Sequence, residues 1–135
     1  MTDWTESELE RIGAADELRI ASRRADGTLR PYVIIWAVRA GDDVFVRSAY
    51  GPENPWFVRA KRAGTGRIQA GGVERDVVFS EVGAADQDAI DAAYHSKYDR
   101  YGERIVGSVV GERAHALTLR LSPVDRSNNS TRGES

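Results

Sequence analysis

The stretch LRIASRRADGTLRPYVIIWAVR, residues 18–39, decides the fold. Its first arm, up to Ser22, alternates apolar with polar or small residues, which is the period of a β-strand. Asp26-Gly27 follows as a turn signal, so this stretch predicts a hairpin. The return arm, 29–39, carries apolar residues on both of its faces. We therefore expect it to be one central strand that is covered on both sides.

Shorter patterns along the rest of the chain predict the other elements. Thr5 and Glu8 have the spacing of a capping box, Asn54 precedes Pro55 as a helix cap would, and Gly71-Gly72 suits a hairpin turn. Strands are expected where residues alternate and helices where apolar residues recur every three or four positions. Further strands are expected at 44–48, 67–70, 73–82 and 116–121, and helices at 5–13, 56–62, 86–101 and, as a short one, 105–110.

The size and order of these elements indicate a single domain. A chain of 135 residues is long enough to bury one core but not two. We expect residues 1–124 to form an α+β domain, a small antiparallel β-barrel of about six strands with flanking helices. The tail, 125–135, has almost nothing to bury and is expected to be disordered.

The composition excludes several classes of function. The chain has no cysteine, which excludes disulfides, thiolate zinc sites and thiol nucleophiles and favours a reducing cytoplasm. Its 19 basic and 21 acidic residues nearly cancel, so there is no excess of positive charge to attract nucleic acid. No signal peptide or long apolar run is present. We expect a cytoplasmic protein that binds neither nucleic acid nor a membrane.

A set of cations and aromatic rings is the strongest candidate site. Arg23 and Arg30 flank the first turn, Arg47 and Ser48 end the third strand, and Arg59 lies on the short helix. If these strands are neighbours, the groups converge on one groove. Trp36 and Trp56 could contact a flat ring there, while the arginines bind phosphate. The alternative is that the arginines are solvated and the tryptophans belong to the core.

A metal site is the weaker candidate. Asp88, Asp91 and His95 share one helical face at spacings that could present two carboxylates and an imidazole. An acidic helix start on a solvated face needs no ligand to explain it, so we expect no metal site. No Gly-x-Ser-x-Gly elbow and no dinucleotide fingerprint in its proper context are present.

Three segments resemble a known superfamily. SRRADGTLRP (22–31), VRS (46–48) with the loop at Gly51, and PWF (55–57) resemble split-barrel flavin-binding and deazaflavin-dependent, nitroreductase-like proteins, over about residues 18–82. Within that group the chain looks most like a bacterial domain-of-unknown-function family. The resemblance implies a split barrel, a homodimer, and flavin mononucleotide (FMN) or a deazaflavin in a groove at the barrel edge or dimer interface. It also implies hydride or electron transfer to a small organic substrate.

Transferred to this chain, the resemblance implicates Arg23, Arg30, Ser48, Gly51 and Trp56. The whole predicted cofactor-binding set is Arg23, Arg30, Trp36, Arg47, Ser48, Gly51, Trp56 and Arg59, and no residue is singled out as catalytic. Two positions depart from the relatives, which often have a Ser-Lys-Gly turn after the third strand and an asparagine in place of Arg59. These departures leave a second hypothesis open, a non-catalytic split-barrel module that binds a small ligand or a protein partner.

Overall fold

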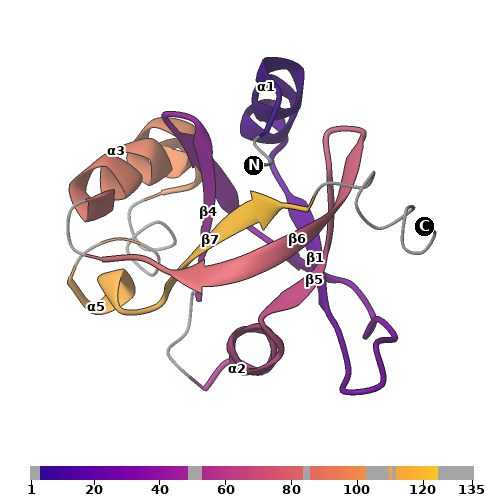
Figure 1. Ribbon diagram of the computed structural model, residues 1–135. Coiled ribbons are helices and arrows are strands. Elements are labelled where there is room, and N and C mark those ends of the chain that lie inside the picture. Colours follow the sequence, from indigo (N-terminus) through magenta and orange to yellow (C-terminus); the bar gives the residue numbers. More distant parts are fainter. Residues whose placement is uncertain (1–3, 49–52, 84–85, 103–109, 111, 125–135) are drawn as a thin grey trace.

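The computed structural model describes residues 4–48, 53–83, 86–102, 110 and 112–124 (Figure 1). Seven antiparallel strands form one sheet in the order β2-β1-β5-β6-β7-β4-β3, with helices packed around it. The strands are β1 (Leu18–Ser22), β2 (Val33–Ile35), β3 (Ala37–Ala40), β4 (Asp43–Arg47), β5 (Thr65–Ala70), β6 (Val73–Glu81) and β7 (Thr118–Pro123). The helices are α1 (Glu6–Ala14), α2 (Pro55–Ala63), α3 (Gln87–Tyr98), a 3₁₀ turn (Asp99–Tyr101) and α5 (Glu112–His115).

The sheet closes into a nearly complete barrel at Trp36. This residue alone separates β2 from β3, and these two strands lie at opposite edges of the sheet. The predicted single strand over 29–39 is therefore wrong. Ile35 pairs with Leu18 of β1, whereas Ala37 pairs with Val46 of β4. The α+β barrel itself is confirmed, with seven strands where the sequence indicated about six.

Apolar side chains from alternate strand positions fill the barrel interior. Two helices close it, with Leu9 and Ile12 of α1 and with Trp56, Phe57 and Ala60 of α2 in the same buried cluster. The helices lie at opposite ends of the barrel in Figure 1. Full burial of each large apolar side chain contributes about 1.5–3 kcal/mol, so α1 and α2 are integral to the domain.

A second core lies outside the barrel, where α3 covers β3 and β4. Val38 and Phe45 meet Ile90, Tyr94 and Tyr98 of the helix. The predicted helix over 86–101 is confirmed, and its apolar stripe is the one that faces the sheet. Because β4 alternates, its odd-numbered side chains point toward this second core and its even-numbered ones toward the barrel interior.

The helix and turn signals have mixed outcomes. The capping box is confirmed, since the Glu8 N–H donates to Thr5 Oγ1 at 3.1 Å and the Thr5 N–H to Glu8 Oε1 at 2.9 Å. Gly71 and Gly72 form the β5–β6 turn with φ of 57° and 85°, as predicted. Asn54 occupies the N-cap position of α2, but its side chain makes no capping hydrogen bond.

Gly66 is required by close packing. A Cβ at this position would lie 2.1 Å from the Ala21 carbonyl oxygen and 2.8 Å from the Phe79 ring. Any side chain would therefore push β5 away from β1 or displace a ring of the barrel core.

Some expectations fall outside the described residues. They are the short helix at 105–110, except for its last residue, and the disordered tail at 125–135. Within the described residues, no helix is both long and apolar enough to cross a membrane.

Candidate functional site

The hairpin that carries Arg23 and Arg30 contains a β-bulge. Ile20 pairs with Val33, but farther out Arg23 is opposite Leu29, so the return arm has one extra residue. The Arg30 N–H donates to the Ser22 carbonyl at 2.9 Å, which makes these two residues cross-strand neighbours. The side chain of Ser22 points inward, in step with the other inward-facing residues of β1. Its cross-strand neighbour Arg30 therefore lies on the interior side of the barrel, and Arg23 lies on the outer face.

Arg23 is held by a ladder of charges on the outer face. Its guanidinium donates to the Gly27 carbonyl at 2.9 Å and to Asp76 Oδ1 at 2.9 Å. Arg67 Nη1 donates to the same carboxylate oxygen at 2.8 Å and its Nε donates to Glu74 at 3.1 Å. Arg67 and Asp76 were not among the predicted site residues. Counting outward from the Gly71-Gly72 turn places them opposite each other, and that signal could have found them.

The end of the barrel that α2 closes gathers four of the predicted residues. Arg30 is half-buried, and the described residues include no hydrogen-bond or ion-pair partner for its guanidinium. Arg59 is exposed on α2, and Trp56 is 7% exposed and packed in the interior cluster. Ser48 is buried, and its N–H donates to the Leu117 carbonyl at 3.1 Å. Gly51 lies outside the described residues.

Arg47 lies on the other side of β4, beneath α3. Its side chain is fully buried and its Nε donates to Thr118 Oγ1 at 3.0 Å. Nη1 donates to Asp91 Oδ1 at 2.5 Å, and Nη2 donates to Gln87 Oε1 at 2.7 Å. This network connects β4, β7 and α3 around the buried guanidinium. The prediction that Arg47 binds a cofactor stays a prediction, because the observed contacts are structural.

Asp91 connects this buried arginine to a histidine. Its second carboxylate oxygen lies 3.0 Å from His115 Nε2. Burial alone would raise the pKa of Asp91, but the hydrogen bonds from His115 and Arg47 outweigh it and lower the pKa. Asp91 is therefore an anion near neutral pH that ties α5 and β4 to α3.

Trp36 is covered by tyrosines in the second core. Its ring stacks on Tyr98 with centroids 4.0 Å apart and planes at 5°, and Tyr101 lies at 5.4 Å with a 34° tilt. Trp36 and Trp56 consequently belong to separate clusters on the two sides of the sheet. The two rings therefore lie apart, and the prediction that Trp36 or Trp56 borders a cofactor ring stays a prediction.

The residues of the metal alternative have separate partners. Asp91 is bound to Arg47 and His115, while His95 Nδ1 lies 2.9 Å from Asp99 Oδ1. Over the part of the chain that the structure describes, no group of three histidine or carboxylate side chains could hold a metal ion.

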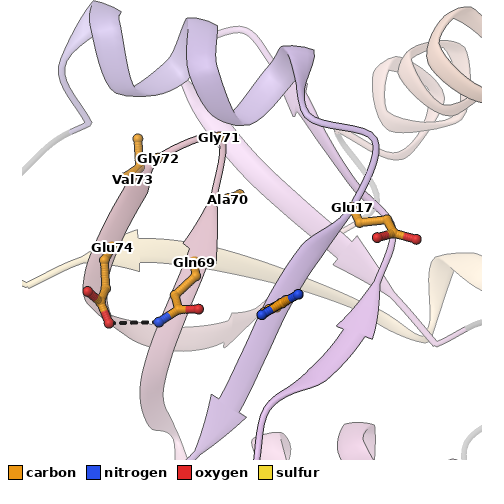
Figure 2. A pocket seen from close by; sticks show the side chains of 8 residues that line it. Glu17, Gln69, Ala70, Gly71, Gly72, Val73 and Glu74 are labelled. Atoms are coloured by element: carbon orange, nitrogen blue, oxygen red, sulfur yellow. Dashed lines mark hydrogen bonds between the residues drawn. The ribbon is translucent and has the colours of Figure 1, made fainter.

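Two cavities lie away from α2. Figure 2 shows one of about 380 Å³ beside the Gly71-Gly72 turn, where Glu74 accepts a 2.9 Å hydrogen bond from Gln69. The other has about 320 Å³ and lies between α1, β3 and α3, with Lys97 on its wall. Neither of these cavities is lined by a residue of the predicted cofactor set.

Several solved structures share this fold. An F420-H2-dependent reductase is 14% identical and has a TM-score of 0.61, over 79% of this chain and 94% of that chain. The heme storage protein of Vibrio cholerae is 18% identical with a TM-score of 0.59, over 93% and 92%. A FAD-binding protein of Mesorhizobium loti is 14% identical with a TM-score of 0.53, over 90% and 91%. At these identities the likeness establishes the split-barrel fold, and no curated protein matches the sequence.

The sequence itself matches one family over most of its length. The matched region, residues 8–121, includes the hairpin, the strands up to the middle of β7, α2, α3 and most of α1. This agrees with the resemblance to an uncharacterised bacterial family of flavin- and deazaflavin-binding split barrels. The chain therefore belongs to the family described as an uncharacterized protein conserved in bacteria, DUF2255.

Proposed function

We propose that this protein binds FMN or a deazaflavin at the α2 end of the barrel and transfers a hydride or electrons between it and a small organic substrate. The observation that carries this proposal is the half-buried guanidinium of Arg30, which has no partner among the described residues. A partly desolvated cation needs an anion, and the planar fork of arginine suits phosphate.

The neighbouring charges on α2 support the same assignment. Arg59 and Arg62 are exposed and, within the described residues, have no ion-pair partner. Lys61, between them in the helix, is paired with Glu81 at 3.1 Å. Positive charge is thus left over where α2 meets the hairpin, which would attract the phosphate of a nucleotide-like cofactor.

In this proposal the protein holds the cofactor and the cofactor supplies the redox chemistry. Arg30 binds the phosphate, Ser48 and the loop at Gly51 offer hydrogen bonds, Trp56 borders the ring, and Arg59 adds charge. Arg23 positions the hairpin through Asp76, while Arg47 and Trp36 fix α3 against the barrel. The F420-H2-dependent reductase and the FAD-binding protein among the structural neighbours support this cofactor class.

We also propose a cytoplasmic homodimer. The absence of cysteine fits a reducing compartment. Ile34 of the edge strand β2 is 52% exposed, an apolar side chain that a second copy would cover. Sedimentation velocity of the full chain tests the dimer, and a monomer at tens of micromolar would contradict it.

The test of cofactor binding is a fluorescence titration of ligand-stripped protein with FMN and with F420. Arg30→Ala removes charge-assisted hydrogen bonds worth about 1.5–3 kcal/mol, so we expect about 10- to 100-fold weaker binding. Arg19→Ala is the control, because Arg19 is an arginine on the other arm of the hairpin, is exposed, and lines the cavity at the end of the barrel away from α2. Folded protein that binds neither cofactor, or equal losses in both variants, would refute the proposal.

One observation favours the second function, a non-catalytic ligand-binding module. No tryptophan offers a free face at the α2 end, since Trp4 and Trp56 are each 7% exposed and Trp36 packs against the second core with one face stacked on Tyr98. A cofactor ring would then have no tryptophan to stack on. A colourless, folded protein that FMN and F420 leave unchanged would favour this module.

A further inference from the structure

Lys97 is a half-buried amine at a junction of three elements. From the last turn of α3, its Nζ donates to the Ala37 carbonyl of β3 at 2.6 Å and to the Ile12 carbonyl of α1 at 3.4 Å. No carboxylate lies within ion-pair distance of Nζ in the described residues. Its charge is therefore balanced by carbonyl dipoles, by the Tyr98 ring at 5.1 Å and by the more distant Asp16 carboxylate, and not by a salt bridge, which is uncommon for a lysine removed from water.

Neither carbonyl depends on this amine. The Ala37 carbonyl also accepts from the Tyr98 hydroxyl at 3.1 Å, and the Ile12 carbonyl accepts from the Ala15 N–H at 3.3 Å. Loss of the ammonium donors would leave both oxygens with a partner. A reaction at Lys97 therefore does not leave either buried carbonyl without a hydrogen bond, which would otherwise destabilise the fold.

Lys97 lines the cavity of about 320 Å³ between α1, β3 and α3. This volume is in the range of small-molecule sites. Leu9, Val38 and Ala93 give it an apolar wall, while Glu10, Arg39 and Ser96 add polar groups. Arg39 is already paired with Glu6 at 3.1 Å, so Glu10 and Ser96 are the groups on this wall best placed to exchange protons with a ligand.

The environment of Lys97 favours its neutral form. Burial lowers the pKa of Lys97 to about 8, with Asp16 raising it and Arg100 lowering it further. At pH 7 about one molecule in ten then carries the neutral amine, about 300 times the fraction for a lysine of ordinary pKa, 10.5. Only the neutral amine is a nucleophile.

We propose that Lys97 is a covalent binding site for a small aldehyde held in this cavity. The amine nitrogen adds to the carbonyl carbon and forms a carbinolamine. The carbonyl oxygen then leaves as water with the two hydrogens of the amine, and a C=N bond remains. The reaction is reversible, involves no oxidant or reductant, and is independent of a cofactor at α2.

The chain offers an internal control, because Lys61 and Lys97 are its only lysines. Lys61 is 43% exposed on α2 and paired with Glu81. We would incubate the full chain with glyoxylate and cyanoborohydride at pH 7, which fixes imines as stable amines, and locate the adducts by peptide mass spectrometry. The N-terminal amine also reacts, but it is read on its own peptide.

The expected result is labelling of Lys97 at least about ten times faster than Lys61, with a rate midpoint near pH 8. Lys97→Arg should abolish this adduct alone. Ser96→Leu, which narrows the cavity from an exposed helix position, should slow labelling of Lys97 and leave that of Lys61 unchanged. Lys61 labelling as fast as Lys97 in folded protein, or no effect of Ser96→Leu, would overturn the assignment.

Discussion

Two tyrosines of α3 allow one hydroxyl group to be compared with another in the same helix. Tyr94 and Tyr98 are both fully buried in the second core. The Tyr98 hydroxyl accepts from the Ala37 N–H at 3.2 Å, and its single proton is shared between the Asp16 carbonyl at 2.8 Å and the Ala37 carbonyl at 3.1 Å. The Tyr94 hydroxyl has no hydrogen-bond partner in the described residues, although the main chain of Arg47 is close to it. Tyr98→Phe therefore removes a hydroxyl group that is hydrogen-bonded, and Tyr94→Phe removes one that is not.

The expected magnitudes follow from these contacts. Tyr98→Phe leaves the buried Ala37 N–H without its acceptor, a loss of about 1–3 kcal/mol in the free energy of unfolding. For 135 residues, each kcal/mol corresponds to about 3.5 °C in melting temperature, so we expect Tm to fall by about 4–10 °C. Tyr94→Phe removes a hydroxyl that is buried without a partner. It should change stability by less than about 0.5 kcal/mol or increase it.

Both variants would be unfolded in urea and melted in a calorimeter, with matched m-values required before the energies are compared. The order of the two effects is what the structure predicts. Equal losses would mean that ring packing, and not the hydroxyl of Tyr98, determines stability at this position. A larger loss for Tyr94→Phe would refute the hydrogen-bond arrangement at the Trp36 crossing.

Four further predictions test other contacts by urea unfolding. Asp91→Asn leaves the buried Arg47 without its anionic partner and should lower the free energy of unfolding by about 2–3 kcal/mol. This is less than the usual loss of about 3–5 kcal/mol because Asp91 is 23% exposed. Asp88→Asn, the control, should have no effect. Folding lowers the pKa of Asp91, so its carboxylate contributes its full stabilisation of the fold above the unfolded pKa of about 4 and loses it as pH falls through the folded pKa. On acidification the Asp91→Asn variant should therefore lose less stability than the wild type. Gly66→Ala should cost at least about 3 kcal/mol or prevent folding, since its Cβ would lie 2.1 Å from a carbonyl oxygen, while Gly83→Ala, with open space, should stay within about 0.5 kcal/mol. Thr5→Ala removes the capping box and should cost about 1 kcal/mol, and no loss would mean that α1 is held by burial alone.

Local signals predicted most of the elements. The capping box at Thr5, the two glycines at 71–72 and the apolar stripe of 86–101 act over a few residues, and each produced the expected structure. The error at Trp36 has a different origin. Alternation of side chains continues through β2 and β3 without a break, and only the strand partners change. Strand partners are set by residues far away in the sequence, so periodicity could not reveal the crossing.

The candidate site was predicted less well because the sequence indicates residue types but not their faces. Arg47 and Ser48 are adjacent in the chain, and adjacency in a strand places them on opposite sides of the sheet. That signal was present and would have placed the Arg47 and Ser48 side chains on opposite sides of the sheet. The partner of Arg23 could not be anticipated, because Asp76 lies 53 residues away and reaches it across β5.

The Ala37 carbonyl connects the barrel closure to the proposed amine site. This oxygen accepts from Lys97 Nζ at 2.6 Å and from the Tyr98 hydroxyl at 3.1 Å, one residue after the chain crosses from one sheet edge to the other at Trp36. An imine at Lys97 would remove the shorter of these bonds and leave Tyr98 as the remaining donor. Occupation of the cavity would then make the Tyr98 hydroxyl more important for closure of the barrel. The loss of stability in Tyr98→Phe should therefore be greater in protein held in the unreduced imine form by excess glyoxylate than in the free protein. A double-mutant-type cycle measures this interaction energy.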